Sequence, residues 1–235
     1  LPLLEVRDVG SLLASGDVTK STVYTLTLAA SDRVIRSIRL EVLPDESLPD
    51  HGPGLTWYEG PRGDFFLSEF ELTAADRPVA IATATHSLAG RPSSSRNDSS
   101  ATAAVDGEMS SGWSINGDQG RPNAAVFQLT EPVPAGTPLT VTLRFERHYA
   151  CGLGCFRVSF SDREDATARG HTAAEETGLA KPAASRSAEE HSLLGRRFLA
   201  AAPELADGPI ADRGEAVETA QFERDRATIL SMAGD

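Results

Sequence analysis

The stretch Ala-Ala-Val-Asp-Gly-Glu-Met-Ser-Ser-Gly-Trp-Ser-Ile, residues 103–115, lies between two runs that look like strands, residues 65–72 before it and residues 124–129 after it. Asp106-Gly107 is among the commonest turn signals. One interpretation is a plain turn between two strands, with Trp113 in the core. The other is an acidic loop that faces an acidic strand, Ser-Glu-Phe-Glu, and supplies the several oxygens that a hard cation such as calcium needs.

Alternating apolar and polar residues predict strands on both sides of this stretch. The clearest run is residues 34–43, in which isoleucine, leucine and valine alternate with arginine, serine and glutamate. Other short runs of this kind are residues 11–16, 23–28, 79–85, 139–145 and 155–161. Many short strands with turns between them, and almost no helical pattern, predict a mainly β fold with an antiparallel β-sandwich.

The pattern changes near Arg163, where the chain becomes rich in alanine and glutamate. Residues 172–175 and 187–190 are capping boxes, in which a hydroxyl and a glutamate satisfy free amides at a helix start. The second box opens a helix with Leu194, Phe198 and Ala201 on one face, and a further helix is predicted over residues 214–226. We therefore expect a β-sandwich domain over residues 1–162 and a C-terminal α-helical extension, or linker to a following domain, over residues 163–235.

Composition and charge argue against several classes of binding partner. The formal net charge is −12, which argues against nucleic acid and anionic membrane surfaces. No apolar run reaches the roughly 18 residues of a membrane span, so membrane insertion is not expected. The chain does not begin with methionine, and we interpret it as a piece of a longer protein.

Cys151 and Cys155 flank Gly-Leu-Gly, and three alternatives stay open for them: a disulfide, a reduced pair or half of a metal site. No histidine follows at the spacing of a zinc site, which argues against zinc. No Cys-x-x-Cys-His sequence is present, so no haem is expected in this segment.

Catalytic motifs are absent from the sequence, so we predict that the protein is not an enzyme. His171 and His191 lie near glutamates in the helical tail and are predicted to be solvated. The adjacent Trp57 and Tyr58 lie in a polar loop, where they either anchor the loop in the core or form a stacking platform for a ligand.

A second group of candidate ligand-binding residues lies at predicted strand ends: Arg121, and the run Arg147, His148 and Tyr149. In a β-sandwich, binding groups collect at the ends of strands. Arginine and aromatic side chains together suit a sugar, because the ring stacks and the guanidinium binds hydroxyls or a sulfate.

Runs along nearly the whole chain resemble the middle region of large planctomycete multidomain proteins, in which a cytochrome-c-like domain precedes conserved domains of unknown function. The similar runs are residues 38–49, 52–54, 66–72, 104–107, 112–115, 125–127, 139–143 and 156–159, with residues 181–182, 186–190, 202–205 and 227–232 in the tail. The resemblance implies a secreted or periplasmic protein whose partners include flanking domains of the same chain.

The Ala-x-Asp-Gly sequence with its downstream tryptophan, and the Ser-Glu-Phe-Glu strand, also resemble the discoidin or galactose-binding-like sandwich. That resemblance implies an antiparallel jelly roll, often with a structural calcium ion and often with carbohydrate bound at the loop ends. Carried over, Asp106 and Glu69 are side-chain calcium ligands, and Ala103, Glu108 and Ser111 provide backbone or hydroxyl oxygens.

The sequence therefore favours a non-catalytic carbohydrate-binding module with a structural calcium ion, whose partner is a polysaccharide. The expected carbohydrate-binding residues are Trp57, Tyr58, Arg121, His148 and Tyr149. A sulfated or acidic glycan would bind through local arginines, against the net negative charge. The alternative is a structural spacer that sets the geometry between cytochrome-c-associated domains and binds no small ligand.

Overall fold

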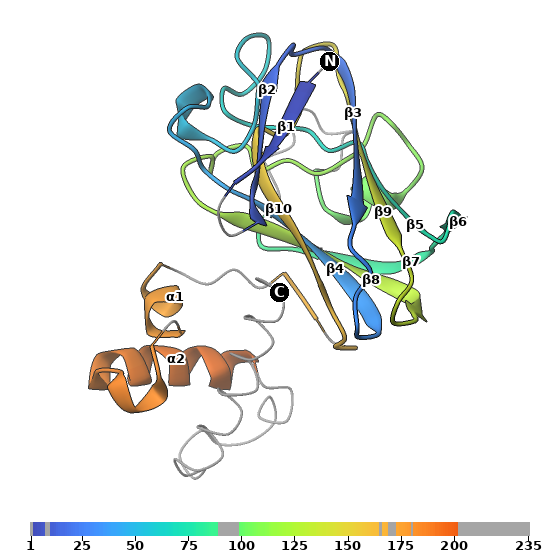
Figure 1. Cartoon of the computed structure of the whole chain (residues 1–235). Coiled ribbons are helices and arrows are strands. Elements are labelled where there is room, and N and C mark those ends of the chain that lie inside the picture. Colours follow the sequence, from blue (N-terminus) through green and yellow to red (C-terminus); the bar gives the residue numbers. More distant parts are fainter. Residues whose placement is uncertain are drawn as a thin grey trace. The chain divides into compact units, whose positions relative to one another are not determined.

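A computed structural model describes residues 2–7, 10–88, 99–164, 166–168, 173–179 and 181–201. The chain divides into two compact units, Leu1–Gly170 and a second that starts at His171. Strands form the first unit, and the described part of the second unit is helical (Figure 1). The domain boundary expected between residues 162 and 163 stays a prediction.

The first unit holds two antiparallel sheets, with the strand orders β1-β2-β10-β4-β8-β7 and β3-β9-β5-β6. The strands are β1 (Pro2–Val6), β2 (Leu12–Gly16), β3 (Ser21–Leu28), β4 (Ile35–Val42), β5 (Glu69–Ala74), β6 (Arg77–Pro78), β7 (Ile81–His86), β8 (Asn123–Val133), β9 (Leu139–Glu146) and β10 (Cys155–Ser161). Two short 3-10 helices, η2 (Pro49–His51) and η3 (Thr102–Val105), lie in the loops. The predicted mainly β, antiparallel character is confirmed.

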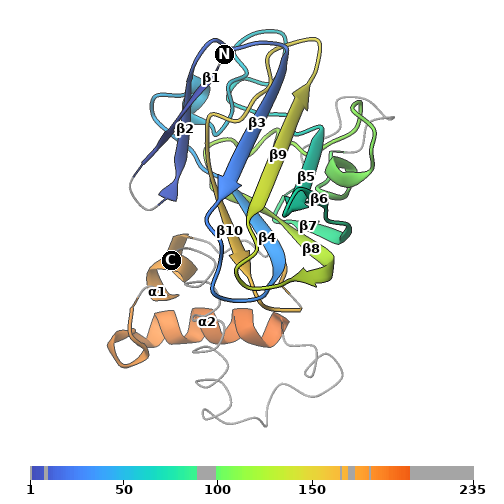
Figure 2. The same cartoon turned by 45° about the vertical axis from the view of Figure 1, so that its right-hand side comes forward.

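From β2 to β5, and again from β8 to β10, each strand lies in the other sheet from the strand before it. Strands β2, β4, β8 and β10 belong to the larger sheet, and β3, β5 and β9 to the smaller one. The pairs are nested, because β2 lies beside β10, β3 beside β9 and β4 beside β8. Segments far apart in the sequence thereby become neighbours, as the colours of the strands in Figure 2 show.

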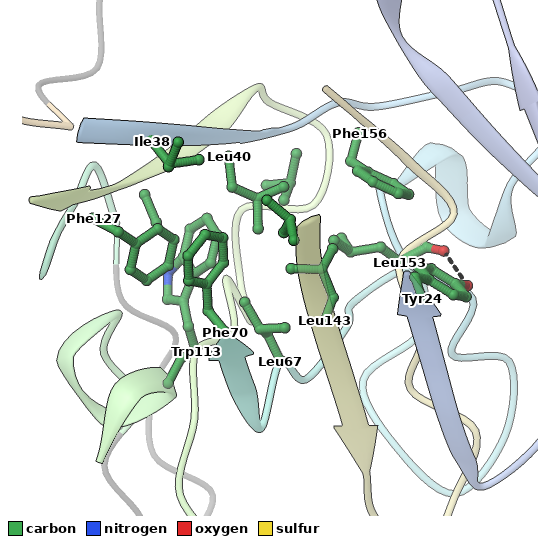
Figure 3. Packing of buried hydrophobic residues seen from close by; sticks show 14 of the residues in the cluster. Tyr24, Ile38, Leu40, Leu67, Phe70, Trp113, Phe127, Leu143, Leu153 and Phe156 are labelled. Carbon is green, nitrogen blue, oxygen red and sulfur yellow. Dashed lines mark hydrogen bonds between the residues drawn. The ribbon is translucent and has the colours of Figure 1, made fainter. Parts of the chain in front are cut away.

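The two sheets share one hydrophobic core. Alternation along β3 buries Tyr24 on one face and leaves Val23 half exposed on the other. Phe70 of β5 stacks on Phe127 of β8, with ring centroids 3.9 Å apart, so this contact joins the sheets. The Tyr24 hydroxyl donates a hydrogen bond to the carbonyl of Leu153 at 2.8 Å (Figure 3). The arrangement is sandwich-like.

The structure differs from the sequence prediction at both strands that flank residues 103–115. The strand expected over residues 65–72 begins only at Glu69, and the residues before it form a buried loop with one bridge, Leu67 to Trp113. The strand expected to end at residue 129 continues to Val133. Pro132, which lacks an N–H, is tolerated because the β4–β8 ladder shifts register between Ile35 and Ser37, beside it.

The second unit contains α1 (Ala173–Leu179), the 3-10 helix η4 (Ala183–Ser185) and α2 (Ala188–Ala201). The capping box predicted at the start of α2 is present: the Ser187 N–H donates to Glu190 Oε2 at 2.8 Å, and the Glu190 N–H donates to Ser187 Oγ at 3.2 Å. Leu194 packs with Leu179 and Phe198, so two of the three residues predicted on the apolar face of α2 lie together.

Several expectations for the tail fall outside the described residues, namely His171, the capping residue Thr172, the side chain of Ala201 and the helix over residues 214–226. His191 is exposed, and its Nε2 lies 3.0 Å from the Ala183 carbonyl oxygen. Among the helices that the structure describes, none combines the length and the apolar character needed to span a membrane.

Replacing Phe70 by alanine tests the contact between the sheets. Phe70 is 2% exposed and stacks on Phe127, so Phe70→Ala should lower the free energy of unfolding by about 3–5 kcal/mol in denaturant titrations. Val23→Ala, on the exposed side of β3, is the control and should change it by less than about 0.5 kcal/mol. Similar small losses in both variants would contradict a core shared by the two sheets.

Candidate functional site

One end of the first unit carries every residue predicted to bind a ligand. In the smaller sheet, Ser21 pairs with Glu146 and Glu69 with Arg144, so β3 and β5 begin where β9 ends. In the larger sheet, Val42 pairs with Asn123 and Phe156, so β8 and β10 begin where β4 ends. The loops that leave these strand ends are residues 17–20, 43–68, 87–88 with 99–122, and 147–154. The predicted site residues lie on these loops or, for Glu69, at the first position of β5.

Trp57 and Tyr58 are exposed, by 45% and 75% respectively. Their rings are perpendicular, with centroids 6.1 Å apart. The interpretation of this pair as an anchor in the core is therefore wrong, because the core at this end is filled by Phe65, Phe66 and Trp113 instead. Exposure leaves the two rings available to stack on a ligand.

The loop of Trp57 and Tyr58 touches the loop of His148 and Tyr149. The Tyr149 ring lies so close to Gly60 that a Cβ at this glycine would come within 2.4 Å of it. The His148 ring meets Tyr149 edge to face at 4.8 Å. We name the group Trp57, Tyr58, His148 and Tyr149 the aromatic platform, because these contacts bring the two loops together.

Arg121 lies on a neighbouring loop and is tied to the aromatic platform only indirectly. Its side chain is 81% exposed and its Nε lies 3.7 Å from Asp118 Oδ1. The side chain of Gln119, on the same loop, donates to the carbonyl of Arg62 at 3.3 Å. The structure thus connects the loop of Arg121 to the Trp57 loop. Among the interactions of the described residues, none joins Arg121 itself to the platform rings.

Two further arginines lie over aromatic rings at this end. The guanidinium carbon of Arg62 is 4.1 Å from the centroid of the Trp57 ring, and that of Arg147 is 3.4 Å from the centroid of Phe66. Sequence reasoning noted Arg147 as a flanking residue and missed Arg62. The only signal for Arg62 was its position in the same polar loop as Trp57, five residues further on.

Glu69 and Asp106, the predicted side-chain calcium ligands, lie together. The Gly107 N–H donates to Glu69 Oε1 at 2.7 Å. Asp106 accepts hydrogen bonds from the Glu108 N–H at 2.8 Å and from the Ser111 hydroxyl at 2.7 Å. Burial raises the pKa of the Glu69 carboxyl, the Gly107 amide opposes this rise, and the negative charge of Asp106 adds to it.

The oxygens around this acidic pair are of the chemical type that a hard cation binds. Two adjacent carboxylates repel each other, and a bound cation would relieve that repulsion. The Ser111 hydroxyl and the Glu108 carbonyl are 3.0 Å apart beside Asp106, and the buried Ala103 lies in η3, just before it. Among the described residues, no three His, Cys, Asp or Glu side chains gather as a metal-ligand group. A calcium ion here would therefore take most of its ligands from hydroxyl and backbone oxygens.

A buried carboxyl group fixes the loops beneath the aromatic platform. Asp64 is 3% exposed, and its Oδ1 accepts a hydrogen bond from the Ile115 N–H at 3.1 Å. Desolvation raises the pKa of Asp64 from 3.8 to about 6, although the hydrogen bonds from Ile115, Phe65 and Ser114 lower it. Asp64 thereby links the Trp57 loop to the stretch that follows Trp113.

The two cysteines are free and buried in this structure, so they form no disulfide. The Cys151 thiol lies 3.8 Å from the carbonyl oxygen of Phe66. Burial raises the pKa of Cys151 to about 12, which keeps this thiol neutral and a poor nucleophile near pH 7. Cys151 therefore acts as a core residue.

Comparison of the chain with protein-family models, curated proteins and solved structures found no match.

The raised pKa of Asp64 predicts a pH dependence of stability. The folded state holds the Asp64 proton more tightly than the unfolded state, so this group stabilises the fold below about pH 4 and loses that contribution as the pH rises through about 6. The loss is on the order of 2–3 kcal/mol. Asp64→Asn should flatten this part of the curve of unfolding free energy against pH.

Urea titrations between pH 3.5 and 7.5 measure the effect. The buried Glu69 carboxyl makes the unfolding free energy change with pH in the same direction in every variant. The difference between the wild-type and Asp64→Asn curves therefore gives the contribution of Asp64. Glu131→Gln removes an exposed carboxylate of β8 and should keep the wild-type slope. Parallel curves for wild type and Asp64→Asn would show that Asp64 titrates normally.

Proposed function

We propose that the first unit is a non-catalytic carbohydrate-binding module. The observation that carries this proposal is the aromatic platform, in which Trp57 and Tyr58 are exposed and their loop touches Tyr149 through Gly60 at the loop end of the sheets. Exposed aromatic faces on loops held by a rigid β scaffold suit ligands with flat apolar faces and polar edges. Sugar rings have such faces, and the neighbouring arginines and His148 supply donors for their hydroxyls.

The fold type that we propose is a jelly roll of the galactose-binding-like kind. Its support is the nested pairing of β2 with β10, β3 with β9 and β4 with β8, which is the pattern of a long antiparallel hairpin wound across two sheets. In this proposal the unit is the middle part of a secreted or periplasmic multidomain protein that resembles the planctomycete proteins. The helices α1 and α2 then belong to an extension toward a following domain.

We further propose a structural calcium ion between β5 and the Asp106 loop. Glu69 and Asp106 would hold it with their carboxylates, and Ala103, Glu108 and Ser111 would add backbone or hydroxyl oxygens. The ion would supply charge neutralisation and fix the loop that leads to Trp113. The adjacent carboxylates and the raised pKa of Glu69 support this assignment.

Calcium should raise the midpoint of thermal unfolding of the wild-type protein, because an ion that binds only the folded state stabilises it by mass action. At a hundredfold excess over the dissociation constant the gain is about 2.7 kcal/mol. Asp106→Asn should abolish this rise, whereas Glu131→Gln, at an exposed carboxylate of β8, should keep it. Equal responses of both variants to calcium and to chelator would place the ion elsewhere.

Polysaccharide binding should depend on the exposed rings. In affinity electrophoresis over a panel of polysaccharides, Trp57→Ala and Tyr58→Ala should each weaken binding by roughly thirtyfold, the loss typical of an aromatic anchor. Leu3→Ala is the control, because Leu3 is 67% exposed on β1, which does not contribute to the platform. Wild-type protein that binds no polysaccharide would favour the structural spacer instead.

A further inference from the structure

We infer that the ligand of the aromatic platform is an anionic glycan, whose carboxylate or sulfate groups bind the guanidinium groups of Arg62 and Arg147. This inference rests on the proposed function and specifies the chemical class of its ligand. It is based on two observations: both arginines stack on aromatic rings, and neither has a carboxylate partner among the described residues.

Both guanidinium groups are held on aromatic rings at the loop end. Arg62 covers Trp57 at 4.1 Å, and Arg147 covers Phe66 at 3.4 Å. Stacking fixes the plane of a guanidinium and leaves its N–H edge free, and that edge matches the two oxygens of a carboxylate or sulfate. The entropy of ordering these long side chains is therefore lost on folding and not on binding.

Neither guanidinium has an anionic partner within the part of the chain that the structure describes. Their guanidinium groups contact these two rings, and the charge of Arg147 also opposes the rise in pKa that burial causes in the neighbouring Tyr149 and Cys151. Several other arginines of the same unit are paired with carboxylates: Arg7 with Asp45 at 2.7 Å, Arg144 with Glu71 at 2.6 Å and Arg157 with Glu41 at 2.7 Å. In a chain of net charge −12, Arg62 and Arg147 at the loop end, like Arg77 on β6, have no carboxylate partner among the described residues.

The carboxylates at this end form no ion pair with either arginine among the described residues, and Glu146, which precedes Arg147, is exposed. Glu59 lies 3.8 Å from Lys20, and Asp118 lies 3.7 Å from Arg121. The Asp64 carboxyl is buried and accepts a hydrogen bond from the Ile115 N–H. The N–H edges of Arg62 and Arg147 are thus left for an external anion.

The same contacts suggest how the glycan lies. Arg62 occupies one face of Trp57, so the ring most available for stacking is Tyr58, which is 75% exposed and perpendicular to Trp57. A sugar stacked on Tyr58 would extend its charged substituent toward Arg62. Arg147 is half-buried, where a charge-assisted hydrogen bond is stronger than at a fully exposed position.

The test compares binding of the full chain to three polysaccharides: dextran (neutral), polygalacturonate (carboxylated) and dextran sulfate (sulfated). The variants are Arg62→Ala, Arg62→Lys, Arg147→Gln and the control Arg77→Ala. Arg77 is exposed on β6, which pairs with the far end of β5, so its loss changes the net charge equally but leaves the platform intact. Thermal unfolding of each variant confirms that it is folded.

We expect at least one anionic polysaccharide to bind, with affinity about tenfold lower in Arg62→Ala and in Arg147→Gln and unchanged in Arg77→Ala. Arg62→Lys should recover only part of the affinity, because an ammonium keeps the charge but not the two-pronged edge. Binding of polygalacturonate alone identifies a uronate ligand, and binding of dextran sulfate alone identifies a sulfate ester.

Two results would overturn the inference while leaving the proposed function in place: preferential binding of dextran, or anionic binding that is insensitive to Arg62 and Arg147. Equal losses in Arg62→Ala and Arg77→Ala would also overturn it, because binding would then follow net charge alone. Absence of binding to all three polysaccharides would count against the proposed function itself.

Discussion

The stacking of Phe70 on Phe127 is the contact on which the rest of the first unit depends, because it joins β5 of one sheet to β8 of the other. With the sheets joined, the pairings of Glu69 with Arg144 and of Val42 with Asn123 set where the strands end. The strand ends in turn decide which loops meet. The aromatic platform and the acidic pair are therefore consequences of core packing, although no platform ring belongs to that stack.

Close backbone contacts hold the loops at the platform end of the unit. A Cβ at Gly54 would come within 1.9 Å of the Asp64 carbonyl oxygen, and one at Gly112 within 2.2 Å of the Leu67 carbonyl oxygen. Only glycine allows the backbone to approach so closely. Exposed rings on a base of this kind lose little freedom when they bind a ligand, which favours binding by a preformed surface.

Sequence periodicity predicted the strands whose two faces differ, such as β3, β4 and β9, and the Ser187 capping box predicted the start of α2. It misplaced the start of β5, because the buried loop before Glu69 is as apolar as a strand. Periodicity left the roles of Trp57 and Tyr58 open, because loop residues show no regular alternation from which burial could be predicted. The stacking of Arg62 on Trp57 and the contact of Tyr149 with Gly60 depend on tertiary geometry that no local pattern encodes.

The nested order of the strands also affects how the protein folds during its synthesis. Leu13 of β2 pairs with Cys155 of β10, so the larger sheet stays incomplete until almost the whole first unit has left the ribosome. Such high contact order slows folding, and meanwhile the apolar faces of the early strands stay open to wrong partners.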